Sequence, residues 1–203
     1  MLEHLPEWLG HAIQGWRAGA DQLVVADPAV GTPVRIDLTS AAFADGGRLP
    51  DRFTEDGDGA SPPLAWTAPP AGATKLALIV EDADSPTPHP LVHAVLWGLP
   101  ADAGSIPEGA LREDAVSGGE VGRNSFRRRG WLPPDPPTGH GEHRYVFQLF
   151  ALGPDAPVPA EPLGRSSLVE AMRGHVLAAG LLTGTYSRAE PAATGPVGAA
   201  TTA

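Results

Sequence analysis

Residues 75–82 read Lys-Leu-Ala-Leu-Ile-Val-Glu-Asp, so every residue between Lys75 and Glu81 is apolar. A short uninterrupted apolar run is typical of a strand that is buried on both faces. Such a strand lies inside a sheet, and the run therefore predicts a sheet that is covered on both sides. Other short apolar runs bounded by turn residues predict further strands at 23–25, 34–38, 91–97, 144–152 and 183–187.

The composition supports a mainly β fold. The chain has 203 residues, of which 25 are Gly and 23 are Pro. Because Gly and Pro cost about 1 and 3 kcal/mol in a helix interior, their even spread disfavours a helix bundle. A hydrophobic fraction of 42% disfavours wholesale disorder. The chain has no Cys, which excludes disulfides, thiolate metal sites and a Cys nucleophile.

The charge of the chain limits its partners. A net charge of -10 argues against a nucleic-acid or anionic-membrane binder, because either would need a basic face. No apolar run approaches the roughly 18 residues of a membrane span. We therefore expect no signal peptide and no transmembrane segment, and a cytoplasmic location.

We expect three parts: an amphipathic helix within residues 1–20, a β domain at 21–188 and a disordered tail at 189–203. The tail contains mainly Ala, Thr, Gly and Pro without periodicity. The N-terminal helix is expected because apolar residues recur at helical spacing. These are Leu5, Trp8, Leu9, Ala12, Ile13 and Trp16.

The apolar face of this N-terminal helix has two interpretations. It packs on its own domain, or it buries Trp8 and Trp16 against a second copy in a homodimer. A second helix is expected at 167–179, where Ser167 and Glu170 form a capping-box pattern ahead of an apolar stripe.

Polar side chains that could carry chemistry occur in three segments. Asp82 and Asp84 follow the buried strand, where such residues bind ligands or simply cap a turn. His93 lies in the middle of an apolar strand, where a lone histidine is usually a core residue. Residues 133–145 are rich in Pro and Gly and end with His143 and Tyr145. Rigid loops of this kind can hold donors around a ligand.

These segments carry a family resemblance. Asp82-Ala-Asp-Ser-Pro86, His93 with Trp97-Gly-Leu-Pro100, and Gly139-His-Gly-Glu-His-Arg-Tyr145 occur in this order. The set resembles the phosphatidylethanolamine-binding protein family, in its bacterial Raf-kinase-inhibitor-like branch, over about residues 34–188. The resemblance implies a sandwich of two antiparallel sheets with a few peripheral helices. It also implies one small pocket for phosphate or a phosphorylated head group.

Carried over position by position, the resemblance implies a set of ligand-binding residues. These are Asp82, Asp84, Pro86, His93, Pro136, Pro137, His143 and Tyr145. A cis peptide is expected at Ser85–Pro86. No cofactor, metal ligand or catalytic residue is assigned. The chain departs from the family pattern at Ala83, Ala94 and Glu142.

An anion pocket containing two carboxylates raises a physical difficulty, because carboxylates repel phosphate. Our hypothesis is that the Asp residues accept hydrogen bonds from a histidine and from the protonated side of the ligand, while His143 and Tyr145 donate to its oxygens. A neighbouring carboxylate would raise the histidine pKa, so phosphate affinity would fall as the pH rises.

Two alternatives remain open. The Asp and His residues could support a metal-assisted or acid–base hydrolase. The resemblance also allows a module that modulates other proteins, since eukaryotic relatives bind kinases. The sequence contains neither a HExxH motif nor a nucleophile elbow, and it does not identify the natural ligand.

Overall fold

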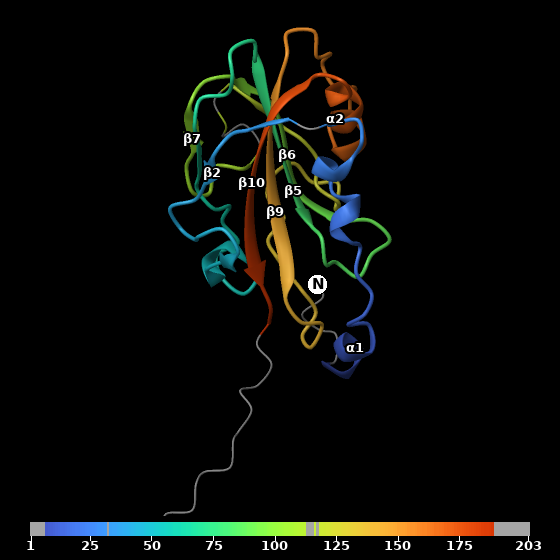
Figure 1. The fold of residues 1–203 in the computed structure, drawn as a ribbon. Coiled ribbons are helices and arrows are strands. Elements are labelled where there is room, and N and C mark those ends of the chain that lie inside the picture. Colours follow the sequence, from blue (N-terminus) through green and yellow to red (C-terminus); the bar gives the residue numbers. More distant parts are fainter. Residues whose placement is uncertain (1–6, 32, 113–115, 117, 189–203) are drawn as a thin grey trace, which may run out of the picture.

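The structure is a computed structural model that describes residues 7–31, 33–112, 116 and 118–188. It confirms a mainly β fold of two sheets with few helices (Figure 1). The larger sheet has the strand order β1-β10-β9-β5-β6-β8, with β3 also paired to β10. Its strands are β1 (Val34–Arg35), β3 (Gly47–Arg48), β5 (Lys75–Asp82), β6 (Leu91–Pro100), β8 (Glu120–Val121), β9 (His143–Leu152) and β10 (Val176–Tyr186).

The smaller sheet has the order β2-β4-β7. Its strands are β2 (Leu38–Thr39), β4 (Leu64–Trp66) and β7 (Gly104–Ile106). The helices are α1 (Glu7–Ala12), α2 (Arg165–Met172) and the single turns η2 (Ala20–Gln22), η3 (Val24–Ala26) and η4 (Asp51–Phe53). Pairing is antiparallel in both sheets, except that the two-residue strands β1 and β3 run parallel to β10.

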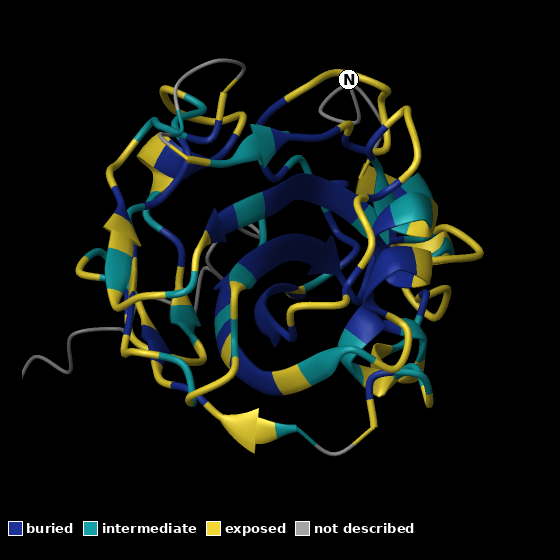
Figure 2. Cartoon of the chain, turned by 90° about the horizontal axis from the view of Figure 1, so that it is seen from above, coloured by how far each residue is buried: buried dark blue, intermediate teal, exposed yellow. Residues whose placement is uncertain are grey.

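The strand β5 is buried on both faces, as its apolar run predicts. Leu76, Leu78 and Val80 pack in the core that includes the smaller sheet. Ala77 and Ile79 point to the opposite side and join a second core that includes α2. Figure 1 shows β2 and β7 on one side of the long strands and α2 on the other, and Figure 2 shows the buried strands at the centre.

The predicted helix at 167–179 is wrong beyond Met172. The helix ends there, Gly174 adopts a left-handed φ of 75°, and β10 begins at Val176. The apolar stripe continues into β10 because this segment pairs with β9 almost along its whole length. Tertiary pairing thus overrides a helical period that the local sequence also satisfies.

Other local predictions also need correction. The predicted strand at 23–25 overlaps the single turn η3. The predicted strand at 34–38 is two short strands in different sheets, because β1 pairs with β10 and β2 pairs with β4. A cis peptide bond precedes Pro162 rather than Pro86 within the described residues.

The N-terminal helix is shorter than predicted. The helix α1 covers Glu7–Ala12, residues 1–6 lie outside the described residues, and so does the predicted tail at 189–203. Gly10 is the buried residue of α1, whereas the side chains of Trp8 and Trp16 are each 69% exposed. The segment therefore contacts its own domain without burying the two Trp residues, and the homodimer stays a prediction.

The fully buried side chain of Glu81 joins three elements of the fold. Its Oε2 accepts hydrogen bonds from the backbone N of Val24, at 2.9 Å, and from Nε2 of Gln148, at 2.7 Å. Its Oε1 accepts from Nε of Arg165 at 2.6 Å. A buried carboxylate is tolerated only when it is paired and hydrogen-bonded, and Glu81 meets that condition.

We predict that Glu81→Ala lowers the free energy of unfolding by about 3 kcal/mol, because it leaves the partners of Glu81 without an acceptor. Urea unfolding measures this difference. The control Glu170→Ala removes an exposed pair with Arg173 and should change stability by less than about 1 kcal/mol. Equal effects of the two substitutions would contradict a structural role of the Glu81 network.

Candidate functional site

A cavity of about 320 Å³ lies where β5 ends and where β6 and β9 begin. All of the predicted site residues except Asp84 line it. Its full lining is Asp82, Ser85, Pro86, Thr87, Leu91, His93, Phe126, Leu132, Pro133, Asp135, Pro136, Pro137, His143 and Tyr145.

Strand register brings the predicted polar residues together. Asp82 is paired with Leu91 on β6 and with Tyr145 on β9. His143 lies two positions from Tyr145, and residues two apart on a strand point to the same face. His93 lies two positions from Leu91, where the register between β5 and β6 shifts, and it lines the cavity. The adjacent strands β6, β5 and β9 therefore present His93, Asp82, Tyr145 and His143 on one face at one end of the sheet.

Both carboxylate oxygens of Asp82 are hydrogen-bonded within the protein. Oδ2 lies 2.7 Å from Nδ1 of His143, and Oδ1 accepts from the backbone N of Asp84 at 2.8 Å. The residue is almost completely buried. Asp82 is thus a structural acceptor in the cavity wall, and its carboxylate is already partnered before a ligand binds.

The structure does not bring Asp84 to the cavity. Its carboxylate accepts from Nε and Nη2 of Arg144, at 2.7 and 2.9 Å, and pairs with Nη1 of Arg17 at 3.0 Å. Burial alone would raise the pKa of Asp84, but the hydrogen bonds from Arg144 and Arg17 outweigh it and lower that pKa. Asp84 therefore pairs with the side chains of Arg144 and Arg17 and does not line the cavity.

Two buried polar atoms on residues that line the cavity have no hydrogen-bond partner among the described residues. They are Nε2 of His93 and Oη of Tyr145, and the two rings meet edge-on with centroids 5.0 Å apart. The other ring nitrogen of His93, Nδ1, lies 2.6 Å from the carbonyl oxygen of Leu132. A carbonyl only accepts, so Nδ1 carries a proton and donates it.

The burial of these two residues keeps them neutral. Burial lowers the pKa of His93, although the Asp82 carboxylate acts in the opposite direction. Burial also raises the pKa of Tyr145 well above its ordinary value of 10.0. With Nδ1 protonated, the neutral ring of His93 offers a lone pair at Nε2, and Tyr145 offers a hydroxyl proton. For His93, the expectation of a carboxylate-raised pKa is therefore wrong.

The ring nitrogens of His143 are both engaged inside the protein. Nδ1 contacts Asp82, and Nε2 lies 2.6 Å from Nδ1 of His140. The ring stacks on Tyr145 with centroids 6.4 Å apart. His143 therefore contributes a ring surface to the cavity, and both nitrogens that were expected to donate to a ligand already have partners.

Some contributors to the site escaped the sequence prediction. The Leu132 carbonyl orients His93, and Arg188 holds the cavity residue Asp135 and the carbonyl of Pro136. Arg17 reaches the backbone of the loop before β9. No local motif marks these residues, because each acts on a segment far away in the chain.

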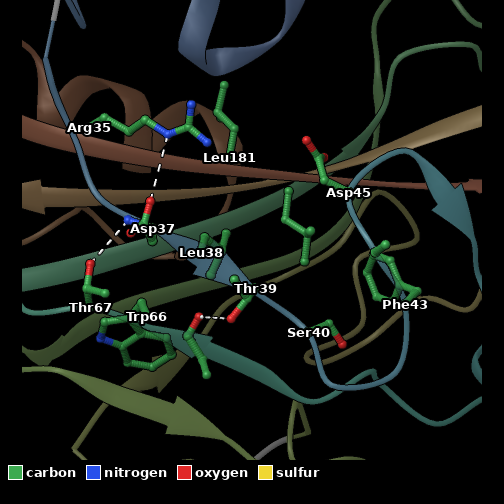
Figure 3. Close-up of a pocket in the computed structure, with 13 residues that line it drawn as sticks. Arg35, Asp37, Leu38, Thr39, Ser40, Phe43, Asp45, Trp66, Thr67 and Leu181 are labelled. Carbon is green, nitrogen blue, oxygen red and sulfur yellow. Dashed lines mark hydrogen bonds and ion pairs between the residues drawn. The ribbon is translucent and has the colours of Figure 1, made fainter.

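A larger open groove of about 570 Å³ lies between the smaller sheet and β10 (Figure 3). Its polar groups bond to one another. Thr39 donates to the carbonyl of Ala65, and the backbone N of Asp37 donates to Oγ1 of Thr67. The Asp37 carboxylate lies 4.0 Å from Nε of Arg35. Buried unpartnered atoms are found at the smaller cavity and not at this groove, within the part of the chain that the structure describes. The smaller cavity is therefore the better candidate site.

The part of the chain that the structure describes offers neither a metal centre nor a membrane-spanning helix. The described residues contain no group of three or more His, Asp or Glu side chains that could hold a metal ion, so the metal-assisted alternative has no candidate centre there. Likewise, none of the helices described is long and apolar enough to cross a membrane.

Comparison with known proteins identifies the family of this chain. The sequence profile of the family described as phosphatidylethanolamine-binding protein matches residues 39–187, and the chain belongs to this family. A UPF0098 protein of Methanothermobacter thermautotrophicus is 39% identical over 155 residues, which cover 75% of this chain and 99% of the relative.

Two solved structures show the same fold. The homologue CT736 from Chlamydia trachomatis, described as a putative phosphatidylethanolamine-binding protein homologue, has a TM-score of 0.67 and 33% identity, and the alignment covers 76% of this chain and 99% of CT736. YbcL of E. coli, described as a new member of the mammalian family, has a TM-score of 0.70 and 25% identity, with coverage of 77% and 100%. The resemblance and the fold predicted from the sequence are both confirmed.

Proposed function

We propose that this chain binds a small ligand that carries a phosphate or phosphorylated head group in the cavity between Asp82, His93 and Tyr145. Family membership supports a ligand-binding role. The observation that carries the proposal is the pair of buried unpartnered atoms, Nε2 of His93 and Oη of Tyr145. A buried polar atom without a partner costs about 1–3 kcal/mol, and a ligand that pairs with both atoms recovers that free energy.

The two atoms define what the ligand must offer. Tyr145 donates a proton and therefore needs an oxygen acceptor, whereas the neutral ring of His93 needs a donor. A singly protonated phosphate group has both: one oxygen accepts from Tyr145 and its P–OH donates to His93. The walls around them are largely apolar, with Leu132, Pro136 and Pro137 among the lining residues. Exclusion of water by such walls strengthens both hydrogen bonds.

The carboxylates near the ligand do not prevent this binding. Asp82 accepts from His143 and from a backbone N–H, and Asp135 is paired with Arg188. Each negative charge in the cavity wall therefore has a donor beside it. Pairing weakens the field that would repel an anion.

We predict that Tyr145→Phe lowers the affinity for methyl phosphate by about tenfold to a hundredfold, since it removes one hydrogen bond to a charged group. Calorimetric titration measures this loss. The stability of the ligand-free protein should not fall, because the deleted hydroxyl has no partner among the described residues.

The matched control is Tyr186→Phe, which removes a hydroxyl that donates to Asp56 at 2.7 Å. This substitution should lower the free energy of unfolding by about 1 kcal/mol and leave the affinity for methyl phosphate within about twofold. An unchanged affinity in Tyr145→Phe would count against the proposed site.

We also predict that the affinity for methyl phosphate falls by roughly tenfold or more between pH 6 and pH 8. A phosphate monoester loses its second proton near pH 6, and the dianion has no P–OH for the His93 lone pair. Burial lowers the pKa of His93, so the ring does not supply that proton at neutral pH. Calorimetry in buffers of different ionisation enthalpy also reports proton uptake. Equal affinities at both pH values would contradict this scheme.

A further inference from the structure

The N-terminal segment, residues 7–19, lies against the loop that leads into β9 (Figure 1) and precedes the family match at 39–187. The contact is close, since a Cβ added to Gly10 would lie 2.0 Å from the carbonyl oxygen of Thr138. Nη1 and Nη2 of Arg17 donate to the carbonyls of Glu142 and His140, at 2.8 and 3.2 Å. The segment is thus packed directly behind the candidate site.

A chain of hydrogen bonds runs from this segment to the cavity. Nε2 of His140 lies 3.0 Å from the carbonyl oxygen of Ile13 and 3.1 Å from that of Trp16. Nδ1 of the same ring lies 2.6 Å from Nε2 of His143, whose Nδ1 lies 2.7 Å from Oδ2 of Asp82. Backbone carbonyls of the N-terminal segment are therefore linked through two imidazole rings to a carboxylate in the cavity wall.

The acceptors in this chain fix its number of protons. Carbonyl oxygens only accept, so Nε2 of His140 must carry a proton. The link from His140 to His143 needs a second proton, and the link from His143 to Asp82 needs a third. Two neutral histidines and an ionised carboxylate hold only two protons between them. The hydrogen-bonded group of His140, His143 and Asp82 therefore holds one more proton, and the net charge of these three side chains is zero instead of −1.

We propose that the N-terminal segment sets the charge of the ligand cavity, because the carbonyls of Ile13 and Trp16 retain the extra proton that cancels the charge of Asp82. This inference rests on the proposed binding of a phosphate group. It also removes the difficulty of an anion beside a carboxylate. Without the segment, Nε2 of His140 has no acceptor and need not carry a proton. His140, His143 and Asp82 would then need only two protons for their two hydrogen bonds, and the negative charge of Asp82 would remain.

The charged and titratable groups around His140, His143 and Asp82 agree with an extra proton on these three side chains. Burial lowers the pKa of His140, as do the neighbouring His143 and Arg17. A neutral His140 leaves the extra proton between His143 and Asp82, and it binds to the His143 ring because an imidazole is more basic than a carboxylate. His93 and Tyr145, which face His143 from the cavity side, are neutral. Arg144 and Arg17 both pair with Asp84, so that cluster carries one surplus positive charge, and Arg17 is the member that helps to keep His140 neutral.

A pair of glycine substitutions in the N-terminal segment tests the proposal. Gly10→Ala creates the clash with Thr138 and should displace the segment from the loop, whereas a Cβ at Gly15 meets nothing within 4 Å. We expect Gly10→Ala to lower the affinity for methyl phosphate by about tenfold or more, since a compensating charge is lost near the anion. Gly15→Ala should bind as the wild type does.

Ring 15N chemical shifts give a readout that does not depend on ligand. At pH 7.5, about one unit above an ordinary histidine pKa, the wild type should show His143 with both nitrogens protonated, and Gly10→Ala should show it neutral. A neutral His143 in the wild type would overturn the proposal. If His143 is charged but methyl phosphate does not bind, the proposed function fails while the control of charge by the segment stands.

If Gly10→Ala fails to fold, substitutions at His140 test the same control of His143 protonation. His140→Gln retains one donor for the carbonyls and one acceptor for His143, so the doubly protonated His143 should persist. His140→Leu removes both and should yield a neutral His143. Identical 15N shifts of His143 in His140→Gln and His140→Leu would also overturn the proposal.

Discussion

The hydrogen bond between Asp82 and His143 is the interaction on which the site depends. It joins β5 to β9 at the end of the long sheet and occupies one oxygen of a buried carboxylate. Because a buried charge without partners is strongly destabilising, this pairing constrains the positions of both strand ends. The same register places His93 and Tyr145 on the cavity side, where two polar atoms stay free for a ligand.

The cavity differs from the other polar clusters of the molecule because two of its buried polar atoms have no hydrogen-bond partner among the described residues. At Glu81, at Asp84 and in the open groove of Figure 3, polar groups are bonded to other parts of the protein. At His93 and Tyr145 the fold leaves two atoms without partners in the part of the chain that is described. Folded proteins rarely leave buried polar atoms unpaired, so such a pair in a cavity indicates a ligand site.

The sequence predicted the central strand and the family motifs better than the ends of the elements and the contacts between distant residues. The apolar run of β5 identified the central strand, and the ordered motifs identified the family and seven of the fourteen residues that line the cavity, because both are local patterns. The end of α2 and the start of β10 were not predictable, since residues 173–179 fit either structure and only pairing with β9 decides between them. Likewise, no local signal shows that Asp84 is occupied by Arg17 and Arg144, or that His140 contacts carbonyls more than 120 residues away.

The most direct test of the central claim is a crystal structure of the full chain grown with methyl phosphate. We expect density for a phosphate group in the cavity, with one oxygen within about 3 Å of Nε2 of His93 and another within about 3 Å of Oη of Tyr145. Density in the open groove beside β10, or an anion held by arginines while those two atoms remain unpaired, would contradict it.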